Sequence, residues 1–169
     1  MNLQNLASLL PIAALCAATC AAPAALALEA AAPAPEFNLP GLKEGVSLAA
    51  LKGKVVYVDF WASWCGPCKQ SFPFMNELQS KYRAQGLEVV AVNLDAKRDD
   101  ADKFLAEVPA RFTVAFDAKG ESAKRFELKG MPSSYLIGRD GRLVAIHKGF
   151  KDDDRKDLEA SIALALAGK

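Results

Sequence analysis

Two cysteines lie where a buried strand runs into a helix. Residues 55–60 have the near-continuous apolar character of a strand that is covered on both faces, and the amphipathic run 69–83 predicts a helix. Cys65 and Cys68 fall at the join. The free N–H groups and the macrodipole at a helix N-terminus stabilise a thiolate and lower the pKa of a cysteine there. We therefore predict that Cys65 is the nucleophile and that Cys68, one helical turn on, closes a disulfide with it.

The residues around the cysteines fit this chemistry. Pro67 falls where a first helical turn tolerates a missing N–H, and Gly66 lets the backbone of a partner come close. Trp64 is expected to shield the sulfurs and to offer a partner a flat apolar platform, whereas a place in the core is the alternative. Trp61 is expected to be a core residue. We assign Trp64, Gly66 and Pro67 to substrate binding.

The run Trp-Cys-Gly-Pro-Cys after a strand with an embedded Asp59 resembles the thioredoxin superfamily. The lead-in, Phe-x-Leu-Pro at 37–40 and Leu-x-x-Leu-Lys-Gly-Lys-Val-Val at 48–56, is similar to the redoxin subgroup. The helix and strand expected over 101–116 look like the central insertion of TlpA-like and ResA-like proteins. The resemblance covers about 37–166 and implies an α/β, thioredoxin-like fold. That fold has a central mixed β-sheet, helices on both faces, an N-terminal β-hairpin and a central helix-strand insertion.

The resemblance also assigns Met131 and Pro132, which open the strand expected over 133–137. A proline in a sheet is tolerated at the first residue of a strand. The resemblance makes this pair the cis-proline motif that packs beside the two cysteines, with Pro132 in the catalytic set and Met131 in substrate binding. A trans turn is the alternative, because cis bonds are about 5% of X-Pro bonds.

Asp59 is the candidate proton acceptor. It lies in a strand that we expect to be buried on both faces, where desolvation raises the pKa of a carboxyl. A carboxyl there can take the proton of Cys68 as that thiol attacks a mixed disulfide. A structural acid bonded to the backbone is the alternative. The chain departs from the families that it resembles at Ala91, where thioredoxin has a strand lysine, and at Ser71, where ResA-like proteins have a glutamate.

The other predicted elements follow apolar runs that are separated by turn residues. They are a hairpin over 37–48, a strand over 87–94, helices over 101–108 and 120–128, a strand over 112–116, strands over 133–137 and 143–146 with a turn at 138–141, and a helix over 151–166. Pro73 is expected to kink the helix over 69–83 because it removes a backbone donor.

Composition limits the possible partners. With 169 residues and 51% hydrophobic residues, the chain is expected to form one globular domain. The net charge of +1 comes from interspersed acids and bases, so nucleic acid is not an expected partner.

Zinc needs four ligands, and beyond the Cys65–Cys68 pair the chain offers only His147, Cys16 and Cys20. We expect no metal, no cofactor and a monomer, with His147 on the surface.

The first charged side chain is Glu29, and the apolar run before it predicts a signal peptide over 1–27, cut after Ala25-Leu26-Ala27. An uncleaved anchor and a lipoprotein are the alternatives, and the run contains no Lys or Arg. All three place the domain outside the cytoplasm, and we predict the periplasm. Residues 28–36 are expected to be an Ala/Pro linker too poor in bulky side chains to pack, followed by the thioredoxin-like domain over 37–169.

The sequence thus predicts an exported thiol-disulfide oxidoreductase that reduces protein disulfides through a mixed disulfide. The resemblance implies disulfide-bearing or dithiol proteins as partners, a membrane electron donor, and a role in cytochrome c maturation or periplasmic thiol repair. A peroxiredoxin-like peroxidase is one alternative, although it would need a lone cysteine preceded by Thr and Pro. A copper or zinc carrier is the other. A Cys-His hydrolase would need His147 beside Cys65, which nothing in the spacing supports.

Overall fold

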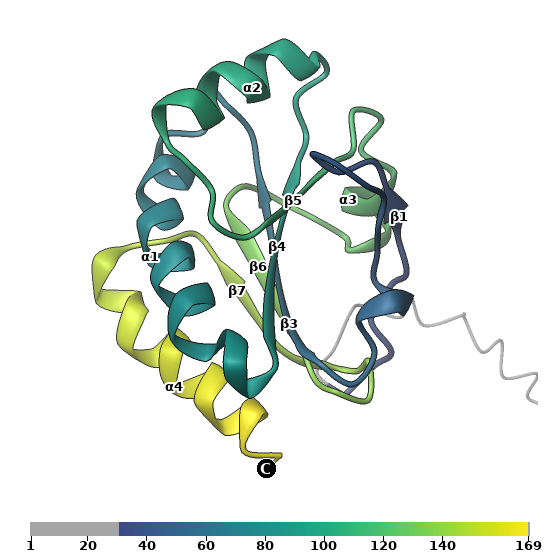
Figure 1. The fold of residues 1–169 in the computed structure, drawn as a ribbon, viewed down its shortest axis with the longest axis vertical. Helices are drawn as coiled ribbons and strands as arrows, with labels where there is room; N and C mark the ends of the chain where they lie inside the picture. The colour runs from purple at the N-terminus through teal and green to yellow at the C-terminus, as the bar shows by residue number, and fades with distance from the viewer. Residues whose placement is uncertain (1–30, 169) are drawn as a thin grey trace, which may run out of the picture.

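The computed structural model describes residues 31–168, and its centre is a five-stranded mixed sheet of order β5-β4-β3-β6-β7 (Figure 1). β3 pairs in parallel with β4, which pairs in parallel with β5, whereas β6 and β7 complete the sheet in antiparallel. The strands are β3 Val55–Trp61, β4 Leu87–Asn93, β5 Thr113–Phe116, β6 Ser133–Ile137 and β7 Leu143–Lys148. The predicted α/β architecture is confirmed.

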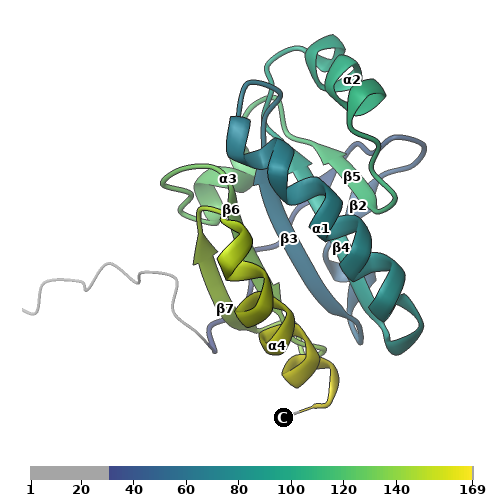
Figure 2. The same cartoon turned by 90° about the vertical axis from the view of Figure 1, so that its left-hand side faces the viewer.

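The central strand β3 is buried along its whole length because both faces of the sheet are covered. Tyr57 and Trp61 point to the layer that contains α1 Gly66–Tyr82 and α4 Arg155–Leu166, whereas Val58 and Phe60 point to the opposite layer. Figures 1 and 2 show α1 and α4 side by side over one face. The short helix α3 Glu121–Arg125 and the N-terminal hairpin cover the other.

The helices differ from the prediction at their ends. α1 begins at Gly66 rather than at 69, because Cys65 is its N-cap and Pro67 fits the first turn, and it continues through Pro73. α2 Arg98–Glu107 begins three residues before the predicted 101, with two aspartates in its first turn that favour the helix dipole. The C-terminal helix is preceded by the 3-10 turn Asp152–Asp154.

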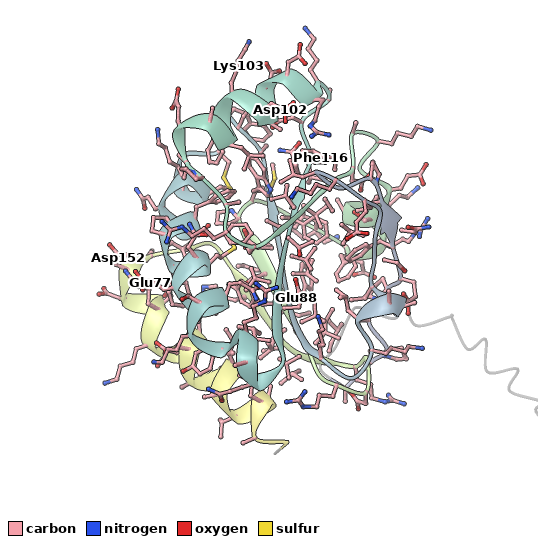
Figure 3. The ribbon with its side chains drawn as sticks, in the orientation of Figure 1. Glu77, Glu88, Asp102, Lys103, Phe116 and Asp152 are labelled. Atoms are coloured by element: carbon pink, nitrogen blue, oxygen red, sulfur yellow. A yellow bond between two sulfur atoms is a disulfide. The ribbon has the colours of Figure 1, made fainter. Side chains whose placement is uncertain are left out.

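α1 and α4 are joined by ionic contacts. Arg155 forms an ion pair with Glu77 on α1 and lies 3.8 Å from Asp152, and Figure 3 shows Glu77 and Asp152 at the same side of the molecule. A second ion pair joins Lys81 to Glu159. These contacts fix α4 beside the helix that carries the cysteines.

The predicted hairpin forms from β1 Asn38–Leu39 and β2 Val46–Ser47. The prediction that the preceding residues do not pack is wrong for 31–34. The backbone N–H of Leu143 donates to Ala32 at 2.8 Å, and that of Ala34 donates to Gly141 at 2.9 Å. Backbone pairing of this kind needs no bulky side chain, so the Ala/Pro composition did not predict it.

The predicted signal peptide over 1–27 and its cleavage site lie outside the described residues. Across residues 31–168, none of the helices is both long enough and apolar enough to cross a bilayer.

Candidate active site

Cys65 and Cys68 form a disulfide at the N-terminus of α1, with Cα atoms 5.3 Å apart. Cys65 is the N-cap of this 17-residue helix, so it lies at the end where the first-turn N–H groups have no partner within the helix. Cys65 is 5% exposed and Cys68 is fully buried. The outer sulfur is therefore the one that a substrate can reach, while the inner one faces the protein interior.

A buried carboxylate holds the turn that leads into Cys65. Asp95 accepts hydrogen bonds from the backbone N–H and the hydroxyl of Ser63, both at 2.9 Å, and from the Asn93 amide at 2.7 Å. The sequence analysis did not single out Asp95, which is only 6% exposed. Parallel β3 and β4 end at the same edge of the sheet, and that pairing is what would have placed Ser63 beside Asp95.

The surface around Cys65 is open. Trp64 is 73% exposed, so the alternative of a core position for Trp64 is wrong. A side chain at Gly66 would meet no atom within 4 Å, so the glycine is not needed for internal packing. Pro67, in the first turn of α1, is also exposed. Trp61, by contrast, is fully buried, as predicted.

A groove of about 350 Å³ runs from Cys65 towards α2. Its lining combines Trp64 and Phe104 with charged side chains that include Lys69, Lys103 and Glu107. Lys103 projects from α2 at one end of the molecule (Figure 3). The central insertion thus forms one wall of the surface beside the outer sulfur.

Met131 and Pro132 lie at the same end of the sheet as the cysteines. The Met131–Pro132 peptide bond is cis. Ser133, the next residue, pairs with Phe60 near the end of β3, and the Met131 side chain packs against the core cluster that contains both cysteines. Among the described residues, the Met131 backbone makes no hydrogen bond to another backbone group. It is therefore free to pair with an extended chain.

Asp59 is 3% exposed, and its Oδ2 has no hydrogen-bond partner in the described part of the chain. The residue opposite it on β4 is Ala91, as the sequence comparison with thioredoxin implied. Burial raises the pKa of the Asp59 carboxyl well above its ordinary value. By the alternation of β3, Asp59 shares the face of Tyr57 and Trp61, which packs against α1.

Ser71 and His147 are the two remaining residues that the sequence analysis discussed. The Ser71 hydroxyl donates to the Cys68 carbonyl at 3.0 Å, so it is turned towards its own helix. His147 does not point away from the protein as expected, since its side chain is 30% exposed and lies against the residues that lead into α4. Among residues 31–168, no three His, Cys, Asp or Glu side chains come together in a way that could hold a metal ion.

The sequence matches the family described as Redoxin over residues 29–162. The thiol-disulfide oxidoreductase ResA of Bacillus thuringiensis subsp. konkukian is 35% identical over 127 residues, which are 75% of this chain and 72% of that protein. A Chlorobium tepidum structure described as a thiol:disulfide interchange protein DsbE has a TM-score of 0.81 at 56% identity, over 82% of this chain and 99% of that one. The thioredoxin domain of a Bacteroides vulgatus thiol-disulfide oxidoreductase has a TM-score of 0.72 at 25% identity, over 80% and 99%. The predicted thioredoxin-like fold is confirmed.

Proposed function

The chain belongs to the Redoxin family and is a thiol-disulfide oxidoreductase, and we propose that it reduces protein disulfides outside the cytoplasm through Cys65 and Cys68. The observation that carries this proposal is the unequal placement of the two sulfurs. Cys65 caps α1 beneath an open surface, whereas Cys68 is fully buried above the face of β3 that holds Asp59.

In the first step, the Cys65 thiolate attacks one sulfur of a substrate disulfide. A Cys65–substrate S–S bond forms, the substrate S–S bond breaks, and the second substrate sulfur leaves as a thiolate. The first-turn N–H groups of α1 stabilise the attacking thiolate, because they have no partner within the helix.

In the second step, Cys68 resolves the mixed disulfide. Asp59 takes the Cys68 proton, and the new thiolate attacks the Cys65 sulfur and releases the substrate as a second thiolate. Two electrons have then passed from the protein dithiol to the substrate. A buried carboxyl with a raised pKa is suited to accept a proton from a thiol, because the two groups then differ less in acidity.

The open surface around Cys65 supports binding of an extended protein segment. The Met131 backbone offers hydrogen bonds beside the sulfurs, and Gly66 and Pro67 leave room for a partner's backbone. The exposed Trp64 ring supplies apolar contact area. The aromatic and charged side chains that line the groove towards α2 would then select among such segments.

We further propose the periplasm as the site of action, on the apolar N-terminal run and its Ala25-Leu26-Ala27 sequence. A dithiol protein of the membrane would return the enzyme to the reduced state by the reverse exchange. We propose cytochrome c maturation or periplasmic thiol repair as the process that this reductant serves.

Single-cysteine variants test the assignment. Cys65→Ser should abolish reduction of a protein disulfide, whereas Cys68→Ser should accumulate a mixed disulfide, because attack survives and resolution does not. Partners trapped in cells by Cys68→Ser would identify the substrate and the donor. If alkylation of the reduced protein at pH 6 labels Cys68 before Cys65, the roles are reversed and the proposal fails.

A further inference from the structure

Three polar side chains lie in register across the sheet on the face that packs against α1 and α4. Asp59 on β3 is paired with Ser134 on β6, and Ser134 is paired with His147 on β7. Directly paired residues share one face and have Cβ atoms about 4.5–5.5 Å apart. The row therefore leads from the buried carboxyl to the edge of the sheet.

On its other side Asp59 is paired with Ala91, whose side chain is a methyl group that can neither donate nor accept a proton. The hydroxyl of Ser134, which is 3% exposed, is the polar group next to Asp59 in the direction of the sheet edge.

A cavity of about 260 Å³ lies over this row, between the sheet and α4. Tyr57, Ser134 and His147 line it from the sheet, and Asp154, Asp157 and Ser161 line it from the C-terminal segment. A cavity of this size with several polar groups can hold more than one water molecule.

Asp59 is within electrostatic range of this cavity. Burial raises the pKa of Tyr57 well above its ordinary value, the charge of Asp59 raises it further, and the Ser134 hydroxyl opposes the shift. Tyr57 thus interacts with both Asp59 and Ser134, and Tyr57 and Ser134 line the cavity wall.

His147 stands at the outer end of the row. Its Nε2 lies 3.3 Å from Asp154 Oδ2, at ion-pair distance but without the geometry of a hydrogen bond. The other titratable groups that line the cavity around it are Asp157 on α4 and Tyr57 on β3. An imidazolium would therefore face two carboxylates, and histidine is the side chain best suited to exchange protons near neutral pH.

We propose that His147 exchanges the proton of Asp59 with solvent, through Ser134 and the cavity, so that Asp59 is ionised when Cys68 attacks. The proposal rests on the role of Asp59 proposed above. The Asp59 carboxyl gives its proton to the cavity, His147 takes it up as imidazolium, and His147 then releases it to the solvent. His147 touches neither the sulfurs nor the substrate, so it acts on the reaction only through Asp59.

The test is single turnover of the reduced protein with a disulfide peptide, followed by stopped flow with a pH indicator. In weak buffer at pH 7, His147→Gln should leave the first attack unchanged and slow both resolution and proton release about tenfold, less than the ~10²- to 10⁴-fold effect of a positioned general base. Added imidazole should restore both rates. Lys148→Gln is the matched control, because Lys148 is exposed and alternates to the other face of β7, and it should match wild type.

Ser134→Ala interrupts the row at its centre with little change in volume. It should slow resolution in the same way, but imidazole should not restore the rate, because this position is buried. The proposal would be overturned if His147→Gln resolved the mixed disulfide at the wild-type rate in weak buffer. It would also be overturned if the rate of resolution fell equally with and without imidazole.

Asp59→Asn separates the relay from the function on which it rests. If Asp59→Asn resolves slowly while His147→Gln resolves like wild type, only the relay is wrong. If Asp59→Asn itself resolves like wild type, the proton-acceptor role and the relay both fail.

Discussion

Asp59 on β3 and Ala91 on β4 face each other directly across a parallel ladder at the centre of the sheet. A carboxyl that is 3% exposed thus has a methyl group, not a cation, as its cross-strand neighbour on that side. Desolvation therefore acts on its acidity without an opposing charge on β4, and the pKa of Asp59 is raised by burial alone. The same burial that suits the carboxyl for proton transfer also opposes folding whenever the carboxyl is ionised.

The first prediction follows from the free energy that is lost when the buried Asp59 carboxyl ionises. In the unfolded chain an aspartate titrates near pH 4, whereas in the folded protein the pKa of Asp59 is higher. As the pH rises above about 4, Asp59 loses its proton in the unfolded chain but keeps it in the folded protein. The wild-type protein therefore loses stability until the pH passes the pKa of Asp59 in the folded state. Asp59→Asn should therefore gain stability over wild type as the pH rises from about 4 through neutrality, by up to about 1.4 kcal/mol per pH unit.

Urea unfolding of the oxidised proteins across this pH range measures the difference. The exposed Asp99 gives a matched control, and Asp99→Asn should stay within about 1 kcal/mol of wild type. A difference that does not grow with pH in Asp59→Asn would mean that Asp59 titrates alike in both states.

The local pattern around the cysteines was sufficient to predict the centre of the site. An apolar run that leads into an amphipathic run defines β3 and α1, and the two cysteines at the join favour thiol-disulfide exchange over a metal site. Cross-strand neighbours could not be predicted in this way, because strand register depends on tertiary pairing. The contacts of Asp95 with Ser63, and the alignment of His147 with Asp59, became visible only when the strands were paired. The backbone pairing of 31–34 with Arg142 and its neighbours also has no signature in composition.

The second prediction concerns the carboxylate of Asp95. In Asp95→Asn an amide group replaces one acceptor oxygen, so a buried donor on Ser63 or Asn93 loses its partner. We expect a loss of about 1–3 kcal/mol of stability, the cost of one unsatisfied buried donor. Chemical denaturation measures this loss, and Asp153→Asn, at an exposed position, should stay within about 0.5 kcal/mol of wild type. An unchanged midpoint in Asp95→Asn would show that the turn before Cys65 does not depend on this carboxylate.

The third prediction concerns the attachment of α2. The Phe104 ring on α2 lies 4.7 Å from the Trp61 ring and 5.0 Å from the Phe72 ring, between centroids. Phe104→Ala should cost about 3–5 kcal/mol and increase amide exchange in α2, because this ring anchors the helix to the core. Leu164→Ala removes a side chain that is 58% exposed on α4 and should change neither measurement appreciably. Protection of α2 at the wild-type level would mean that other contacts hold the insertion.

The last prediction concerns Trp64, a large apolar side chain that is 73% exposed beside the nucleophilic sulfur. A ring with so little contact to its own chain contributes little to folding, so Trp64→Ala should change stability by less than about 0.5 kcal/mol. As a docking platform, however, it should contribute to substrate affinity. We expect kcat/KM for a protein disulfide to fall at least about tenfold, equivalent to ~1.4 kcal/mol, while reduction of a small aromatic disulfide stays near the wild-type rate.

Comparison of the two substrates separates docking from sulfur chemistry. Leu42→Ala is the matched control, because Leu42 is an apolar side chain, 50% exposed, on the N-terminal hairpin rather than beside the cysteines. It should leave both rates unchanged. An equal loss on both substrates in Trp64→Ala would show that the ring acts on the reactivity of Cys65, and no loss on either would remove Trp64 from the binding surface.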